Sequence, residues 1–216
     1  KVKDRLFEIA NDIIKLAAAR ELVNGIKINT DKKILEDFQK SAGFDYTKDQ
    51  KRSIKEIFAD LSSGRVMDRL LSGDVGFGKT EVAMNAMLAV ILDGYQAIFV
   101  CPTTLLATQH YHSMQKRFSE FGISIAKLDG KTSAKEKTEI KKALENGDIK
   151  IVIGTHSLLE IKTNNLALVI IDEEHKFGVK QKEKLKHLRE DVHIFSMSAT
   201  PIPRTLNLAL SKLKGM

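Results

Sequence analysis

The sequence of 216 residues predicts an α/β fold, with a mostly parallel sheet that helices cover on both faces. Two patterns lead to this expectation. Short apolar runs alternate with helical patterns, and such alternation is typical of right-handed crossovers between parallel strands. The runs are continuously apolar, as strands are when both faces of their sheet are buried. We expect this domain to span residues 65–216 and to follow a helical N-terminal appendage.

The appendage comes first along the chain. Residues 1–24 carry apolar side chains at helical spacing, and Asn24 and Gly25 supply a stop signal. Residues 31–63 predict two more helices, the first with Thr30 as a candidate N-cap. We therefore divide the chain into an amphipathic linker or relay helix, a helical segment and the α/β domain, over residues 1–30, 31–64 and 65–216.

Strands and helices then alternate in the α/β domain. The apolar runs that predict strands cover residues 68–73, 96–101, 124–129, 151–155, 166–173 and 193–200. The helical patterns between and after them cover residues 79–93, 104–120, 133–146, 178–189 and 204–213. Helices between consecutive strands are the crossovers that a parallel sheet requires.

Composition narrows the classes of protein and of partner. A hydrophobic content of 43% is enough for a full core and excludes a disordered tail. The formal net charge of +7 favours a polyanionic partner, although 28 acidic residues are interspersed with the 35 basic ones. The single Cys101 excludes a disulfide framework and argues against a metal site. No apolar run reaches the roughly 18 residues of a membrane span, so we expect no membrane partner and a cytoplasmic location.

A glycine-rich stretch lies between an expected strand and an expected helix. Its pattern is that of a P-loop, in which backbone N–H groups and the start of the helix point at phosphates. We expect Lys79 to reach the β- and γ-phosphates and the Thr80 hydroxyl to bind Mg²⁺. The alternative is a tight glycine turn with an exposed lysine. The candidate nucleotide-binding residues of the loop are Gly73, Asp74, Val75, Gly76, Phe77, Gly78, Lys79 and Thr80.

Two adjacent carboxylates, Asp172 and Glu173, end the apolar run of residues 166–173. Asp172 is a candidate for completing the magnesium shell, and Glu173 for orienting or deprotonating the attacking water. With Lys79 they form the expected catalytic set. By themselves the two acids are equally consistent with the start of a loop, and the P-loop upstream favours catalysis. His175 is either a surface histidine or a link between the nucleotide and another surface.

Together these motifs resemble the superfamily 2 helicases and translocases. Motifs I, Ia, Ic, II and III of that superfamily match, in order, Gly73–Thr80, "PTTLLATQH" (102–110), "IGTHSLL" (153–159), "DEEH" (172–175) and "SAT" (198–200). "DEEHKFGV" and "SATPIPRT" are similar to the RecG-like branch, and "GDVGFGKTEVAM" resembles the transcription-repair coupling factors within it. The resemblance spans the whole chain. It implies a RecA-like P-loop domain, the first of two motor domains, with the second absent after Met216.

The resemblance also implies roles for polar and aromatic residues. Phe44 and Gln50 match an adenine-binding element, with a core phenylalanine and a capping glutamine as the alternative. The residues that it places on DNA are Thr103, Thr104, Gln109, Thr155 and His156. For the threonines of "PTTLLATQH", N-capping is a second role that is compatible with the first. The residues that it implies in coupling ATP turnover to movement are His175, Ser198 and Thr200.

The implied function is the ATP-binding half of an ATP-dependent double-stranded DNA translocase, which displaces stalled RNA polymerase in transcription-coupled repair. Its cofactors are then ATP and Mg²⁺, and its partners are double-stranded DNA, RNA polymerase, repair proteins and the second motor domain. We expect the isolated domain to hydrolyse ATP weakly or not at all. Two alternatives stay open: the motor domain of a RecG-like fork-remodelling helicase, and a non-catalytic DNA-binding or regulatory module.

Overall fold

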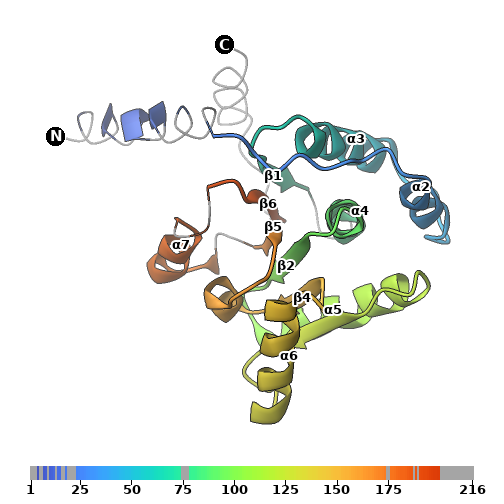
Figure 1. The fold of residues 1–216 in the computed structure, drawn as a ribbon. Coiled ribbons are helices and arrows are strands. Elements are labelled where there is room, and N and C mark those ends of the chain that lie inside the picture. Colours follow the sequence, from blue (N-terminus) through green and yellow to red (C-terminus); the bar gives the residue numbers. More distant parts are fainter. Residues whose placement is uncertain are drawn as a thin grey trace.

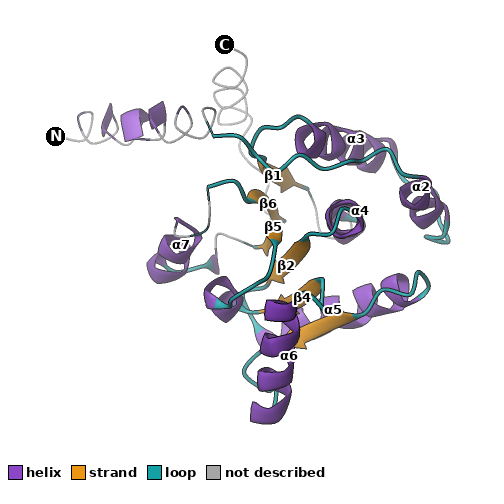
Figure 2. Ribbon diagram, viewed as in Figure 1, coloured by secondary structure: helices purple, strands orange, loops and turns teal. Residues whose placement is uncertain are grey.

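The computed structural model describes residues 23–73, 78–173, 176–186, 188 and 190–199 and, nearer the amino terminus, residues 4, 7, 8, 10–12, 14, 15 and 18. In this part of the chain, six parallel strands form one sheet in the order β1-β6-β5-β2-β4-β3. The strands are β1 (Asp68–Ser72), β2 (Gln96–Val100), β3 (Ile125–Leu128), β4 (Ile151–Gly154), β5 (Leu166–Asp172) and β6 (His193–Ser198). The predicted α/β class and the six predicted strands are confirmed (Figure 2).

Helices join these strands and cover the sheet. They are α2 (Lys33–Lys40), α3 (Lys48–Ser62), α4 (Lys79–Leu92), α5 (Thr104–Ser119), α6 (Ala134–Asn146), the 3₁₀ helix η1 (His156–Glu160) and α7 (Val179–Lys186). The helices α4 to α7 start within one residue of the patterns that predict them. The predicted helix over residues 204–213 lies outside the described residues.

Both faces of the sheet are buried, as the continuously apolar runs predict. In β2, Phe99 belongs to the hydrophobic cluster that includes residues of α2, α3, α4 and α5. Its neighbours Ile98 and Val100 belong to a second cluster, which includes residues of α6 and η1. Figure 1 shows α2, α3 and α4 on one side of the sheet and α7 on the other. The sheet is therefore the middle layer of three.

Helix α4 is buried along most of its length, because residues 81–91 are between 0% and 8% exposed. The sheet covers one side of this helix, and α2 and α3 cover another. Phe38 of α2 and Leu61 of α3 belong to the same cluster as α4. Residues of the segment 31–64 thus share one core with the helix that follows the glycine-rich loop.

The predicted N-cap of α2 is wrong. The helix begins at Lys33 rather than next to Thr30, so Lys32 occupies the N-cap position and makes no side-chain cap there. The Lys32 ammonium instead donates to the Leu92 carbonyl at 2.9 Å and to Asp93 Oδ1 at 2.6 Å. A cation is favourable at that end of α4, because the last carbonyls of a helix carry partial negative charge.

The described residues between 4 and 18 are helical and exposed, and Phe7 is 72% exposed. Asn24, the predicted stop, forms an antiparallel bridge with Arg65 shortly before β1. The chain that leads out of this stretch is therefore tied to the edge of the sheet. Among the helices of the described residues, none is both long and apolar enough to cross a membrane.

Candidate functional site

The carboxyl ends of the strands meet at one edge, because the strands are parallel. Most of the candidate residues follow these ends: Gly73 after β1, Thr103 after β2, Thr155 after β4, Asp172 at the end of β5 and Ser198 at the end of β6. The strand order puts β1, β6 and β5 side by side. The expected phosphate and magnesium residues lie at the ends of these strands or in α4, which follows β1. We call these three strands the nucleotide half of the edge. Strands β2, β4 and β3 form the other half, which carries the expected DNA residues.

The described end of the glycine-rich loop is a constrained helix start. Gly78 is the N-cap of α4 and adopts left-handed backbone, with φ 70° and ψ 30°. A Cβ there would be strained and would clash with the Gln50 side chain, so this position requires glycine. The Lys79 ammonium donates to the carbonyl oxygens of Gly73 at 2.7 Å and of Ser198 at 3.3 Å. The lysine is only partly exposed, which disfavours the alternative of a glycine turn with an exposed lysine. The loop candidates Asp74, Val75, Gly76 and Phe77 lie outside the described residues.

Asp172 ends β5 and Glu173 follows it, so both lie in the nucleotide half. Asp172 is 7% exposed. Glu173 has a φ of 56°, and it is the one non-glycine residue with positive φ in the described part of the chain. This backbone conformation costs a non-glycine residue about 1 kcal/mol, and the Glu173 N–H holds it by donating to the Met197 carbonyl at 2.9 Å. Strain of this kind is typical of functional sites.

The donor set of the nucleotide half fits magnesium. Thr80, in the first turn of α4, and Asp172 both offer the hard oxygen atoms that Mg²⁺ prefers. Cys101 lies near Asp172, but burial, with a smaller effect of the Asp172 charge, raises the pKa of its thiol.

His110 was not predicted as a site residue, and the structure places it next to Asp172. Its Nε2 lies 2.9 Å from Asp172 Oδ2, and its ring packs on Phe99 with the ring centroids 4.9 Å apart. The sequence does contain a signal for a role of His110, because this residue ends the motif "PTTLLATQH". The motif does not say which face of α5 meets β5, and so the contact was not predictable from it.

The structure bears on the structural alternatives for the two adenine-binding candidates, and adenine binding itself stays a prediction. Gln50 is 4% exposed, and its Oε1 accepts from the Thr47 N–H at 2.9 Å in a capping box. Its Nε2 donates to the Gly78 carbonyl at 3.4 Å. The capping alternative is thus confirmed for Gln50, whose amide also supports the P-loop. Phe44 is 54% exposed, so the core alternative is wrong for this ring, and its face is accessible for stacking.

A buried polar cluster behind Phe44 was not predicted. Glu81 Oε1 on α4 accepts from the Tyr46 hydroxyl and from Arg117 on α5, both at 2.5 Å. Arg117 also donates to Ser41 Oγ and to the carbonyl of Phe38, and its guanidinium lies over the Phe38 ring. Burial and the bond to Glu81 raise the pKa of Tyr46, which keeps its proton. The cluster ties α2, the loop before α3 and α5 to the first turns of α4.

Four of the five DNA candidates lie at helix starts on the other half of the edge, and Gln109 lies in the second turn of α5. Thr103 is the N-cap of α5, and its hydroxyl accepts from the Leu106 N–H at 3.2 Å, so its predicted capping role is confirmed. Thr155 takes the same place before η1 but makes no side-chain cap. The other candidates of this half are partly or fully exposed: Thr104, Gln109 and His156. Hydroxyls and helix N-terminal amides in this arrangement are suited to phosphate groups. Ser198 belongs to the nucleotide half, while His175 and Thr200 lie outside the described residues.

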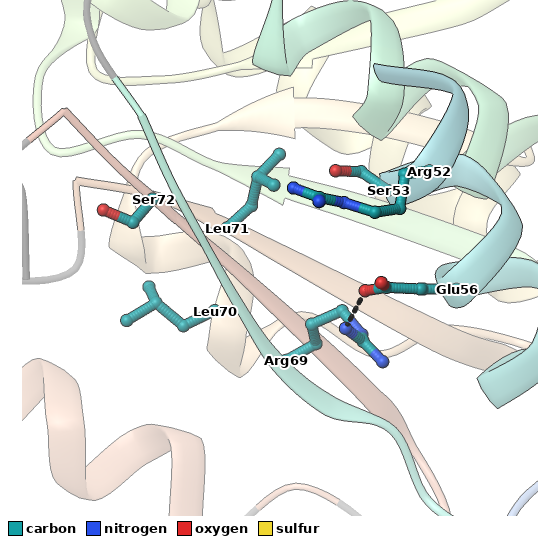
Figure 3. A pocket seen from close by; sticks show the side chains of 7 residues that line it. All are labelled: Arg52, Ser53, Glu56, Arg69, Leu70, Leu71 and Ser72. Carbon is teal, nitrogen blue, oxygen red and sulfur yellow. Dashed lines mark hydrogen bonds and ion pairs between the residues drawn. The ribbon is translucent and has the colours of Figure 1, made fainter. Parts of the chain in front are cut away.

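A cavity of about 300 Å³ lies between α3 and β1 and ends at Ser72, the residue before Gly73 (Figure 3). Arg69 occupies one wall and pairs with Glu56 and Asp60, at 2.8 Å each. These pairs join α3 to the edge strand β1. Two of the charged residues that line the cavity, Arg69 and Glu56, are thus paired with each other.

The model of the DEAD/DEAH box helicase family matches residues 47–209, which is well over half of the chain. The chain belongs to the DEAD/DEAH box helicase family. Family membership implies a nucleotide-binding domain of the ATPase and helicase type. The predicted RecA-like fold agrees with it.

Within the helicase family, the chain is similar to the transcription-repair-coupling factors and to RecG. The chain is 56% identical over 216 residues to the transcription-repair-coupling factor of Helicobacter pylori, covering 100% of this chain and 22% of that protein. It is 45% identical over 218 residues to the factor of Bacillus subtilis, covering 100% and 18%. A structure of RecG bound to a three-way DNA junction is similar with a TM-score of 0.84 and 42% identity, covering 97% of this chain and 28% of that one. The chain thus spans about a fifth of its curated relatives. The predicted resemblance to the coupling factors is confirmed.

Proposed function

We propose that this chain is the first motor domain of an ATP-dependent double-stranded DNA translocase, which displaces stalled RNA polymerase in transcription-coupled repair. The similarity to the coupling factors over the whole chain supports this function. The observation that carries it is the meeting of Lys79, Asp172 and Ser198, from α4, β5 and β6, at one edge of the sheet. Such a protein would act in the cytoplasm, because in bacteria its proposed DNA and polymerase partners reside there.

ATP binding would begin with an exchange of partners at Lys79. Its ammonium donates to the carbonyls of Gly73 and Ser198, and phosphate oxygens are stronger acceptors because they are charged. Transfer of the ammonium to a phosphate would release the contact with Ser198. The residue that ends β6 would then respond directly to the presence of the triphosphate, which is the coupling role that the resemblance assigns to Ser198.

Thr80 and Asp172 are the residues that would hold Mg²⁺. The bound ion would neutralise charge on the phosphates. Glu173 follows Asp172 in a constrained backbone, and its carboxylate would orient or deprotonate the attacking water. The second motor domain would form the other side of the ATP-binding cleft. We therefore expect this chain alone to bind Mg-nucleotide but to hydrolyse it slowly.

DNA would bind to the other half of the edge. The residues proposed for it are Thr103, Thr104, Gln109, Thr155 and His156. Their hydroxyl, amide and imidazole groups are suited to backbone phosphates, which carry no sequence information. A translocase requires contacts of this kind, because it moves over any sequence.

Release of a stalled polymerase by the full-length protein tests the proposal. We expect ATP-dependent release with the wild type, none with Lys79→Ala, and wild-type release with Lys116→Ala. Lys116 is an exposed lysine on α5 and serves as the matched control. Release by Lys79→Ala at the wild-type rate would contradict the proposal.

Fork remodelling is the second candidate, and the similarity to RecG on a three-way junction favours it. The same three proteins would be assayed on a three-way DNA junction. Lys79-dependent unwinding of the junction, without release of polymerase, would favour the fork-remodelling helicase. A non-catalytic module would bind DNA, and Lys79→Ala would have no effect in either assay.

A further inference from the structure

We infer that His110 is a positioning residue, which fixes the carboxylate of Asp172 from helix α5 and so links the proposed DNA half of the edge to the proposed magnesium site. The inference rests on the proposed function, because it takes Asp172 as the magnesium ligand. His110 ends the motif "PTTLLATQH", but none of the roles expected from the sequence was assigned to it.

The contact between the two side chains is close and sheltered. His110 Nε2 lies 2.9 Å from Asp172 Oδ2, and the side chains are 18% and 9% exposed. An ionised carboxylate only accepts hydrogen bonds, so Nε2 carries the proton and donates. The His110 ring also packs on Phe99 of β2, which constrains its orientation from a second side. A donor held in this way limits the rotation of the carboxylate, as the outer partners of metal ligands do.

Helix α5 connects this contact to the DNA candidates. Thr103 is the N-cap of the helix and Thr104 is its first residue. His110 lies about 9 Å further along the helix axis, at 1.5 Å per residue. A helix of this length moves nearly as a rigid body. A phosphate that shifts the first turn of α5 would therefore also shift His110 and, through one hydrogen bond, the Asp172 carboxylate.

A role in packing alone predicts different behaviour. Phenylalanine at position 110 would keep an aromatic ring against Phe99 but would lose the donor. Glutamine would keep a donor close to the place of Nε2 but would lose the ring. The matched control is His112, an exposed histidine on the same helix. Its ring contact is with Tyr111.

The test measures the affinity of the chain for fluorescently labelled ADP, once with Mg²⁺ and once with EDTA. The ratio of the two affinities is the benefit of magnesium, and a general loss of stability does not change it. We expect His110→Phe to bind ADP as the wild type does in EDTA. The ratio of its affinities with Mg²⁺ and with EDTA should be about tenfold smaller than that of the wild type. We expect His110→Gln to keep most of the benefit, and His112→Phe to keep all of it.

Coupling is tested in the full-length protein by the Mg²⁺ concentration that gives half-maximal ATP hydrolysis. DNA should lower this concentration for the wild type and for His112→Phe, and should not lower it for His110→Phe. If His110→Phe does not fold, His110→Asn replaces it, because the asparagine amide takes the place of Nδ1 and does not reach Asp172.

An unchanged benefit of magnesium in His110→Phe would overturn the inference. So would an equal loss of affinity with Mg²⁺ and with EDTA, since packing alone would explain it. If the wild type bound no nucleotide under either condition, the proposed function would fail first and the inference with it. The two failures are therefore distinguishable.

Discussion

The two halves of the strand edge are built differently. Around β1, β6 and β5 the candidate side chains are engaged with the protein itself: Lys79 bonds to two carbonyls, Gln50 is 4% exposed, and Glu173 is held in left-handed backbone. Around β2 and β4 the candidates are partly or fully exposed, and Thr103 makes a single local capping bond.

This difference matches what each half is proposed to bind. A triphosphate that reacts requires fixed positions, because small displacements of reacting groups lower the rate steeply. A DNA backbone that slides past requires donors that release easily. Substitutions in the nucleotide half should therefore change chemistry or folding strongly, and substitutions in the DNA half should change affinity mildly.

Glu173 carries the largest expected effect. Glu173→Gln keeps the shape of the side chain but removes the base, so we expect ATP hydrolysis by the full-length protein to fall about 100-fold or more. Its unfolding free energy should match that of the wild type. Glu173→Asn should be as inactive but more stable than Glu173→Gln by about 1 kcal/mol, because asparagine tolerates left-handed backbone. ATPase assays and urea unfolding of the chain measure the two effects.

Equal stabilities of the Gln and Asn variants would show that the backbone of Glu173 stores no strain. Wild-type hydrolysis in either variant would remove Glu173 from the catalytic set.

Arg117 tests how strongly the nucleotide half is anchored. Arg117→Ala leaves the buried Glu81 carboxylate without its cation, and we expect a loss of about 3 kcal/mol in the unfolding free energy. The neighbouring Lys116 is exposed, so Lys116→Ala should change the unfolding free energy by less than about 0.5 kcal/mol. Urea unfolding of the two variants provides the measurement. Similar losses in both would show that the cluster around Glu81 does not anchor α4.

Thr103 and Thr155 sharpen the contrast within the DNA half. Thr103→Ala removes an N-cap and should lower the unfolding free energy by about 1 kcal/mol. Thr155 makes no side-chain cap, so Thr155→Ala should leave stability nearly unchanged. Both should weaken DNA binding by the full-length protein by only a few-fold. A much larger loss of DNA affinity in either variant would mean that this half is as finely arranged as the nucleotide half.

His193 has the smallest expected effect and lies at the start of β6, at the end of the sheet opposite the site. Its Nδ1 accepts from the Met67 N–H at 2.9 Å, and its Nε2 donates to the Ile26 carbonyl at 2.6 Å. Burial lowers the pKa of His193 below its usual value of 6.5. The unfolded chain therefore takes up a proton at a higher pH than the folded chain does. Stability should be retained above about pH 6.5 and should fall as the pH drops below it.

Thermal unfolding at about pH 7.5 and about pH 5.5 measures this dependence. His193→Asn should be less stable overall and should show a smaller difference between the two pH values. Nucleotide affinity should not follow the same pH profile, because His193 is remote from Lys79 and Asp172. A full pH dependence of stability in His193→Asn would assign it to other groups.

The strands and the start of α4 were predictable because their signals are local. A continuously apolar run such as β5 indicates burial on both faces, and the spacing from Gly73 to Thr80 indicates the turn between a strand and a helix. The prediction failed for Thr30, because a threonine before a helical pattern indicates an N-cap only when the helix begins next to it. Here α2 begins at Lys33.

The contacts between elements were not predictable. Glu81 and Arg117 are 36 residues apart and are indistinguishable from surface charges in the sequence, until α4 and α5 pack against α2. The contact of His110 with Asp172 likewise depends on which face of α5 meets the sheet. For Gln50, the sequence left two roles open. Its bond with Thr47 confirms the capping role, and adenine binding stays a prediction.

The central claim is that Lys79 and the start of α4 bind the phosphates of a magnesium nucleotide. Isothermal titration calorimetry of the 216-residue chain with Mg-ADP tests it most directly, with Lys116→Ala as the control. The claim predicts one saturable site in the wild type and in Lys116→Ala, and an affinity weaker by about tenfold or more in Lys79→Ala. Equal binding by all three chains, or none by the wild type at millimolar ligand, would contradict it.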